Sequence, residues 1–149
     1  MSDSLIPTSL LQIYISHLPG FQPLVDSDSW RVAFLNFTNN LAPNQIDEFQ
    51  RHNESNELFV LLSGRCILFL GDGVETITHI FAQDLHPFTL YCVQSQAWHT
   101  HALSPDAKLL IVENRNTSPA NSPRIKITPD QQAELIGLTN LLWKENDDH

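Results

Sequence analysis

Four side chains of types that bind metal ions occur as two separate pairs in this sequence. His52 and Glu57 form the first pair, and His99 and His101 form the second, much later in the chain. Each pair precedes an apolar run with the composition of a β-strand. Imidazole nitrogens and carboxylate oxygens are ligands that divalent first-row metals accept in proteins. The two pairs therefore predict one shared metal site, provided that the fold brings both segments together.

Strand geometry decides which of these side chains can converge. Successive side chains point to opposite faces of a strand, so residues two apart share a face. Gln50 shares a face with His52, and His101 shares a face with His99. If these faces and that of Glu57 all point into a barrel, His52, Glu57 and His99 approach one point, with Gln50 and His101 nearby. Two imidazoles and one carboxylate would leave coordination positions open for water or substrate.

The elements expected to position these residues are mostly strands. Apolar runs between turn residues predict strands at 31–38, 49–52, 57–62, 65–70, 75–80, 88–93, 97–103 and 108–113, with an edge strand at 124–128. The Asp72-Gly73 pair between two of them is typical of a hairpin turn, because such a turn needs a positive φ. Short strands at this even spacing predict an all-β sandwich or small barrel.

The two ends of the chain have a different pattern. Residues 4–18 carry apolar side chains at roughly helical spacing, which predicts a short helix or an edge strand that ends at Pro19-Gly20. At the other end, Thr128 is a plausible N-cap and Pro129 suits the first helical position. The apolar residues that recur at helical spacing after them are Leu135, Leu138, Leu141, Leu142 and Trp143. We expect one amphipathic helix at about 129–145, lying on the barrel.

The length and the charge exclude several classes of protein. A chain of 149 residues suits one domain, 1–149, with a barrel core at about 30–115. The net charge is −9 and the basic residues form no stripe, so nucleic acid and anionic membranes are not expected as partners. No apolar run is long enough to cross a bilayer, and the first residues do not look like a secretion signal, so we expect a cytoplasmic protein. Cys66 and Cys92 lack metal-type spacing and are expected to be buried free thiols.

The first pair resembles the first motif of the cupin superfamily. That motif runs Gly, five residues, His-x-His, three or four residues, Glu, six residues, Gly. Gln50, Arg51 and His52 occupy the His-x-His positions here, and Glu57 and Gly64 follow at the motif spacing. Gln50 therefore stands where the motif has its first histidine.

The second pair resembles the second cupin motif, which runs Pro-x-Gly-x-x-His with Asn four residues on. His99 occupies the histidine position, and Leu103 stands at the asparagine position. Gln94 and Gln96 replace the usual proline and glycine. The resemblance covers roughly residues 30–115.

This resemblance implies a small single-domain cupin with a double-stranded β-helix, the RmlC-like jelly-roll barrel. His52, Glu57 and His99 would take the places of three of the four usual metal ligands, and Gln50 would be an optional fourth. The metal would be Fe, Mn, Ni or Zn, since these ligands do not select one. Members of the superfamily commonly pair through an outer β face, so we expect a homodimer.

The resemblance also implies a range of functions. The first hypothesis is a metal-dependent isomerase, epimerase or oxygenase that acts on a small polar metabolite such as a sugar derivative. The second is a non-catalytic cupin that binds or senses a small molecule and has lost its metal. The third is a metal-free epimerase, in which Tyr91 would be the acid opposite His52 or His99. His101 lies one strand repeat, roughly 6.6 Å, beyond His99 and is expected to face the substrate.

Strand parity also predicts the packing of the other apolar side chains. The residues expected inside the barrel are Phe59, Leu61, Leu68, Leu70, Phe88, Tyr91 and Val93. Those expected on outer faces are Leu58, Val60, Leu62, Ile67 and Phe69. An outer face this apolar needs a cover, which could be the second sheet, the C-terminal helix or a partner subunit. His79 and His86 are interpreted as surface residues.

Overall fold

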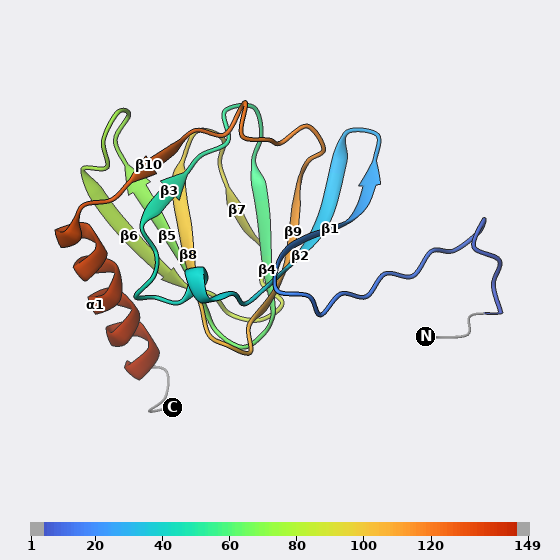
Figure 1. The fold of residues 1–149 in the computed structure, drawn as a ribbon, viewed down its shortest axis with the longest axis horizontal. Coiled ribbons are helices and arrows are strands. Elements are labelled where there is room, and N and C mark those ends of the chain that lie inside the picture. Colours follow the sequence, from blue (N-terminus) through green and yellow to red (C-terminus); the bar gives the residue numbers. More distant parts are fainter. Residues whose placement is uncertain (1–4, 146–149) are drawn as a thin grey trace.

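A computed structural model describes residues 5–145 and shows two antiparallel sheets of five strands that face each other, with one helix outside them (Figure 1). The first sheet has the strand order β1-β2-β9-β4-β7, and the second has β10-β3-β8-β5-β6. The strands are β1 Gly20–Ser27, β2 Trp30–Asn36, β3 Glu48–Gln50, β4 Glu57–Ser63, β5 Cys66–Asp72, β6 His79–Asp84, β7 Tyr91–Val93, β8 Trp98–Leu103, β9 Lys108–Asn114 and β10 Arg124–Lys126. A short 3₁₀ turn, η1, spans Asn39–Leu41 and the helix α1 spans Pro129–Glu145. The predicted all-β jelly roll with a C-terminal helix is confirmed.

Strands that are distant in sequence pair within each sheet. β3 pairs with β8, so Gln50 lies opposite His99. β4 pairs with both β7 and β9 in the first sheet. These crossovers bring the segment that contains His52 and Glu57 and the segment that contains His99 to the same end of the barrel.

One strand was not predicted. β1 contains Pro23, and the sequence around it has the composition of a turn. β1 is an edge strand that pairs only with β2, and its register shifts between Pro23 and Val25. Proline is tolerated at such a position, because an edge strand leaves alternate backbone N–H groups unpaired. The barrel therefore begins at Gly20 rather than near residue 30.

The N-terminal prediction was wrong. Residues 5–18 form neither a helix nor a strand, and residue 4 lies outside the described residues. This segment leaves the barrel in an irregular extended path (Figure 1). Most large apolar side chains of this segment are exposed, so packing within residues 5–145 gives a helix here little stability.

Several of the predicted strands are displaced or shortened. The predicted strand 49–52 is observed as β3, which ends at Gln50 and leaves His52 outside it, and β10 ends at Lys126. The predicted strand at 75–80 is observed as β6, because the turn after Asp72 is longer than a two-residue hairpin and Asp72 pairs with His79. Only Tyr91–Val93 of the predicted strand 88–93 is a strand. Phe88 has a positive φ of 58° and is 82% exposed, so its predicted place in the barrel interior is wrong.

The barrel interior is filled by side chains from both sheets. Phe59, Leu61, Leu68 and Val93 are buried in this cluster as predicted, and Leu70 and Tyr91 pack against it half-buried. Cys66 is also buried there, and burial raises the pKa of its thiol, so it is inert. Cys92 is exposed on β7, which contradicts the prediction of two buried thiols.

A second core lies between the outer face of the second sheet and α1. It contains Ile67, Phe69 and Trp98 together with Leu135 of the helix. The helix therefore covers the outward-facing side chains of Ile67 and Phe69, which was one of the predicted alternatives. Leu141 is 54% exposed, so the predicted apolar stripe is one residue too wide.

The helix begins as predicted at Thr128. The Thr128 hydroxyl accepts a hydrogen bond from the backbone N–H of Gln131, and the Gln131 side chain accepts one from the N–H of Thr128. This reciprocal pair is a capping box, which satisfies two backbone donors at the helix start. Within residues 5–145, no helix combines the length and the apolar composition needed to cross a bilayer.

Candidate metal centre

His52, Glu57 and His99 come together between the two sheets at one end of the barrel. His99 lies on β8 of the second sheet, and Glu57 is the first residue of β4 in the first sheet. Their ligand atoms all lie within 4.8 Å of one another, and all three side chains are buried. The structure therefore brings together the three residues for which the sequence predicted a shared site.

His52 follows the end of β3 and is held by backbone contacts on both sides. The N–H groups of its two neighbours, Arg51 and Asn53, donate to the carbonyls of Pro123 and Asn121. The carbonyl of His52 itself accepts from the N–H of Gln96, at 2.7 Å. These contacts fix the position of the imidazole although the residue lies outside a strand.

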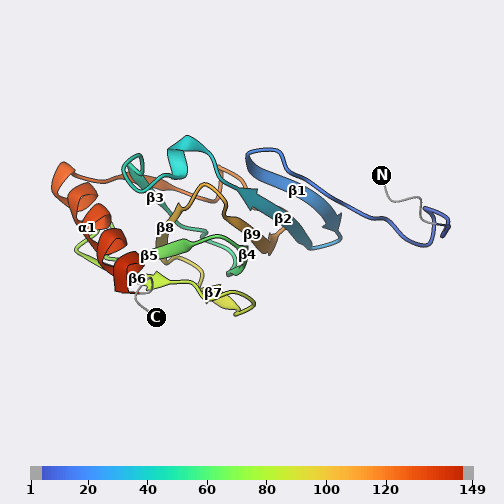
Figure 2. The same ribbon diagram turned by 90° about the horizontal axis from the view of Figure 1, so that it is seen from below.

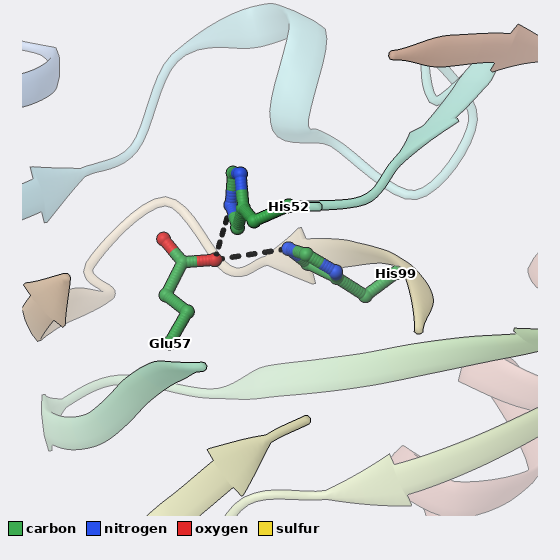
Figure 3. Close-up of side chains that lie close together, drawn as sticks. All are labelled: His52, Glu57 and His99. Carbon is green, nitrogen blue, oxygen red and sulfur yellow. Dashed lines mark hydrogen bonds and ion pairs between the residues drawn. The ribbon is translucent and has the colours of Figure 1, made fainter. Parts of the chain in front are cut away.

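One oxygen of Glu57 receives both imidazoles. The Oε2 atom lies 2.9 Å from Nε2 of His52 and 2.9 Å from Nε2 of His99 (Figure 3). The other carboxylate oxygen points away from both rings (Figure 3). The ring centroids of the two histidines are 5.1 Å apart.

The second nitrogen of each ring determines where its proton lies. Nδ1 of His99 is 2.9 Å from the carbonyl oxygen of Ala97, which can only accept, so Nδ1 carries a proton. A neutral His99 then directs the lone pair of Nε2 at the Glu57 oxygen, and two acceptors face each other. A second proton on His99 or a cation among the three side chains removes this conflict.

His52 has the same arrangement. Its Nδ1 lies 2.7 Å from Oγ of Ser122, and that hydroxyl donates to Oδ1 of Asn121. The hydroxyl therefore accepts from Nδ1, and Nε2 is again the atom that faces Glu57. Histidines that bind metals commonly donate their other ring N–H to a carbonyl or hydroxyl group in this way.

The charges at the centre favour a cation. Burial opposes ionisation of Glu57, but the hydrogen bonds and charges of His52 and His99 outweigh it and lower the Glu57 pKa to about 2. Burial also opposes a charge on His52, yet the hydrogen bond with Glu57 and the attraction of Glu57 and Glu113 raise its pKa. Glu57 is thus an anion at neutral pH. The donor set, the protonated outer nitrogens and the ionised carboxylate fit a divalent first-row metal, so these three residues could hold one.

Two adjoining cavities lie beside this centre. One, of about 310 Å³, is lined by His52 and Glu57, and the other, of about 330 Å³, extends along β3 towards η1. Both are lined by Gln50 and His101, which therefore stand where the cavities meet. The two together offer room for a small metabolite.

His101 is buried and lacks a bonding partner at one nitrogen. Its Nδ1 has no hydrogen-bond partner among the described residues, and only 8% of the residue is exposed. Burial, together with the nearby His99, lowers the His101 pKa to about 4, so the ring is neutral at ordinary pH. A buried polar atom without a partner, on the wall of a cavity, is available to a ligand.

Tyr91 lies elsewhere. Its hydroxyl oxygen accepts a hydrogen bond from the backbone N–H of His86, in the loop before β7. It is not among the residues that line the two cavities. This placement gives no support to the proton-donor role predicted for Tyr91. His86 and His79 are exposed, as predicted.

The sequence interpretation missed several polar residues that line the site, and four of them carry a charge or contact His52. Glu113 lines the cavity, where burial and the charge of Glu57 raise its pKa to about 7. Arg31 lies 3.4 Å from Glu113 and also pairs with Asp26. The other two are Ser122 and Arg124. Glu113 has the same strand parity as the interior residues of β9, so alternation alone could have revealed it. Ser122 lies outside any strand and gave no such signal.

The last glycine position of the first motif, Gly64, and the glycine position of the second motif, Gln96, both lie in turns. Gly64 has a φ of 68°, and a Cβ atom there would lie 2.5 Å from the backbone of Ala107, so no other residue fits. At the glycine position of the second motif, Gln96 adopts a φ of 67°. The turn before His99 thus forms in the left-handed conformation without glycine.

Comparisons with known proteins identify the fold. No family model and no curated protein matches this chain. A solved structure of Streptomyces Pac13 with uridine is 14% identical, with a TM-score of 0.52, over 90% of this chain and 98% of that one. Another structure describes Pac13 as a nucleoside dehydratase. A protein of Bacillus halodurans is 12% identical, with a TM-score of 0.51, over 68% and 74%.

A cupin-2 domain protein from Shewanella frigidimarina is also similar, at 15% identity and a TM-score of 0.47 over 72% of this chain and 88% of that one. The Pac13 structures and the Bacillus halodurans protein share the fold of this chain, a barrel of two facing antiparallel sheets of the kind that its cupin-like motifs predicted. The barrel carries a His-Glu-His group that could hold a metal ion.

Proposed function

We propose that this protein is a small cupin enzyme that holds one divalent metal ion and acts on a small polar metabolite, such as a sugar derivative. The ion is Fe, Mn, Ni or Zn, and its ligands are His52, Glu57 and His99. When bound, such an ion polarises a substrate oxygen, as isomerases, epimerases and oxygenases require.

The tautomer of His99 is the observation that carries this proposal. Its Nδ1 proton is committed to the Ala97 carbonyl, so Nε2 is left as a lone pair next to the Glu57 carboxylate. A bound cation satisfies both groups at once. Three ligands also leave positions open for a substrate, which a closed structural site would not.

The cavity residues support a polar substrate. Arg31 and Glu113 offer a donor and an acceptor on the wall, and His101 presents a neutral imidazole with a free nitrogen. Such a lining suits hydroxyl and carbonyl groups better than an apolar molecule. Pac13, the fold neighbour solved with uridine, offers a precedent for a ligand that contains a sugar.

Gln50 is proposed as an optional fourth ligand. It lies opposite His99 across the β3–β8 pair and therefore on the same face of the sheet. Its amide oxygen is a weaker ligand than an imidazole for late first-row metals. His101 is proposed to contact the substrate rather than the ion, because it lies one strand repeat further along β8.

Elemental analysis of protein purified without an affinity tag tests the metal site. We expect one first-row metal per chain in the wild type, and its loss in His52→Ala and in Glu57→Gln, which keeps the size of the side chain. His86→Ala removes an exposed histidine and should retain the metal. Protein that binds none of the four metals after reconstitution would contradict the proposal.

A second candidate function is a cupin that binds or senses a small molecule without a metal. It is favoured by the direct contact of Glu57 with both imidazoles, since doubly protonated rings satisfy the carboxylate without an ion. In that case a thermal-shift screen with nucleosides and sugars would find a ligand for protein that contains no metal. The homodimer and the cytoplasmic location stay predictions.

A further inference from the structure

Glu113 is a buried carboxylate that the candidate metal centre does not use. Its side chain is 5% exposed and lines the cavity of about 310 Å³, but it is not one of the three residues whose ligand atoms lie within 4.8 Å of one another. Within residues 5–145 its bonding partner is Arg31, whose Nη1 lies 3.4 Å from Oε1 of Glu113. Charge-assisted hydrogen bonds of this type usually close to about 2.7–2.9 Å. The charge of Glu113 is therefore only weakly compensated for its burial.

Arg31 also has bonding capacity left for a ligand. Its Nε donates to Oδ1 of Asp26 at 2.9 Å and its Nη1 donates to Oε1 of Glu113. In the part of the chain that the structure describes, neither Nη2 of Arg31 nor Oε2 of Glu113 has a hydrogen-bond partner. An unused donor and an unused acceptor thus lie on two side chains that contact each other in the cavity wall. A hydroxyl group both donates and accepts, so two neighbouring hydroxyl groups match this pair.

The strand register places this pair beside the candidate metal centre. Arg31 of β2 lies directly opposite Glu113 of β9, and Val112 lies opposite Leu58 of β4, the residue after Glu57. The strands β2, β9 and β4 are neighbours in the first sheet, so Arg31, Glu113 and Glu57 form one row on its inner face (Figure 2). Opposite side chains on neighbouring strands are about 4.5–5.5 Å apart. A ligand bound by Arg31 and Glu113 is therefore about one strand spacing from Glu57, a distance that a sugar ring can span.

The charges along the cavities favour an uncharged ligand. The arginines that line the two cavities are Arg31 and Arg124, and each already contacts carboxylates of the protein. Arg124 pairs with Glu48, and Arg31 pairs with Asp26 as well as with Glu113. A phosphate or carboxylate group on the ligand would have to compete with one of these acids for its arginine.

We propose that Arg31 and Glu113 bind two neighbouring hydroxyl groups of the substrate and thereby select an uncharged sugar or a molecule that carries one. This inference rests on the proposed function, because it takes the lumen of the barrel as the substrate site. One hydroxyl group donates to Oε2 of Glu113, and its neighbour accepts from Nη2 of Arg31. A site of this kind rejects an analogue that lacks one of the hydroxyl groups, because a buried polar atom is then left unpaired.

Saturation-transfer NMR and calorimetric titration of the full chain test the subsite. The probes are the methyl glycosides of D-glucose, D-galactose, D-mannose, D-xylose and D-ribose, the monodeoxy analogues of each glycoside that binds, and the phosphates of the same sugars. We expect at least one glycoside to bind, and the loss of either bound hydroxyl group to weaken binding about tenfold or more. Failure of all five glycosides to bind, or tighter binding of the sugar phosphates, overturns the proposal.

Glu113→Gln tests the direct contact. It keeps the size of the side chain and removes the charge of the acceptor, so affinity for the glycoside should fall about tenfold or more. Affinity for the monodeoxy analogue that lacks the hydroxyl group at Glu113 should hardly change, whereas a merely structural role would weaken both ligands equally and overturn the proposal. Arg31→Lys, which keeps the charge but loses the guanidinium fork, should give the same pattern with the other monodeoxy analogue. Glu134→Gln alters an exposed glutamate on α1 and is the matched control.

Elemental analysis separates this inference from the proposed metal-dependent function. Glu113→Gln should retain the metal content of the wild type, because Glu113 is not part of the His-Glu-His group. A wild type that holds a metal but binds no glycoside overturns the sugar subsite and leaves the metal site standing. A wild type that holds no metal but binds a glycoside through Glu113 supports the subsite and contradicts the metal-dependent enzyme. Thermal unfolding checks that each variant is folded, and the wild-type comparison of glycosides with their monodeoxy analogues decides the matter for a variant that is not.

Discussion

The backbone N–H of Gln96 donates a 2.7 Å hydrogen bond to the carbonyl of His52, which joins the turn before β8 to the residue after β3. This contact joins the two motifs that supply the candidate metal-binding side chains, in addition to the pairing of Gln50 with His99. Gln96 adopts a left-handed φ of 67° in this turn. That conformation costs a residue with a side chain about 1–2 kcal/mol.

Gln96→Gly is therefore expected to stabilise the protein. Glycine adopts positive φ without the steric cost, and its greater freedom in the unfolded chain offsets part of the gain. We expect the free energy of unfolding, measured in urea, to rise by about 1 kcal/mol. Ser95→Gly is the control, since Ser95 is not among the positive-φ residues, and it should be neutral or destabilising. Equal effects of the two changes would contradict this account.

Ser122→Ala is expected to weaken metal binding. The Ser122 hydroxyl lies 2.7 Å from Nδ1 of His52 and fixes the ring that presents Nε2 to the centre. Loss of such an outer partner commonly costs about 10–100-fold in metal affinity. A competition titration with a chelator measures the change. Ser63→Ala, which removes an exposed hydroxyl remote from the centre, should leave the affinity unchanged.

Gln50→His is expected to tighten metal binding by about tenfold or more, because an imidazole replaces an amide oxygen on the face that His99 occupies. The same titration measures it. Gln22→His, on the edge strand β1, serves as the control for adding a histidine. Unchanged affinity in Gln50→His would mean that position 50 does not face the ion.

The free energy of unfolding of the metal-free protein should decrease as the pH is lowered, and His101 should contribute to this decrease. Its pKa is lowered from 6.5 to about 4 in the folded state, mainly by burial. Between these values the unfolded chain binds a proton that the folded chain does not, so stability falls as the pH drops from 6.5 to about 4. The loss attributable to this group is on the order of 3 kcal/mol at its limit.

His101→Gln removes this titration while keeping a polar side chain. Urea unfolding of both proteins across this pH range should give a flatter profile for the variant. Parallel profiles would show that His101 is not held neutral by burial.

Most of what the sequence predicts about the candidate metal centre follows from the alternation of side chains along strands. Parity and spacing predict that His52, Glu57 and His99 converge, and the structure brings their ligand atoms within 4.8 Å, although His52 lies just beyond β3 rather than within a strand. Glu113 was within reach of the same argument, but its role depends on which strands become neighbours. Sequence alone does not specify that pairing.

The errors in the fold have local physical causes. β1 was missed because Pro23 is acceptable only on an edge strand, and an edge is a property of the assembled sheet. Phe88 was placed inside the barrel because its apolar character was visible and its positive φ was not. Residues 5–18 have a helix-like pattern, yet most of their large apolar side chains are exposed, so packing within residues 5–145 does little to stabilise a helix there.

The strand that carries His99 and His101 is packed on both sides. Its inward side chains line the lumen, while Trp98 and Ala102 lie in the separate core beneath α1. The wall of the cavity thus derives much of its rigidity from residues that lie in a separate core, away from the lumen. Evolution or protein design can therefore alter the lumen to accept new molecules while the scaffold that holds the histidines remains firm.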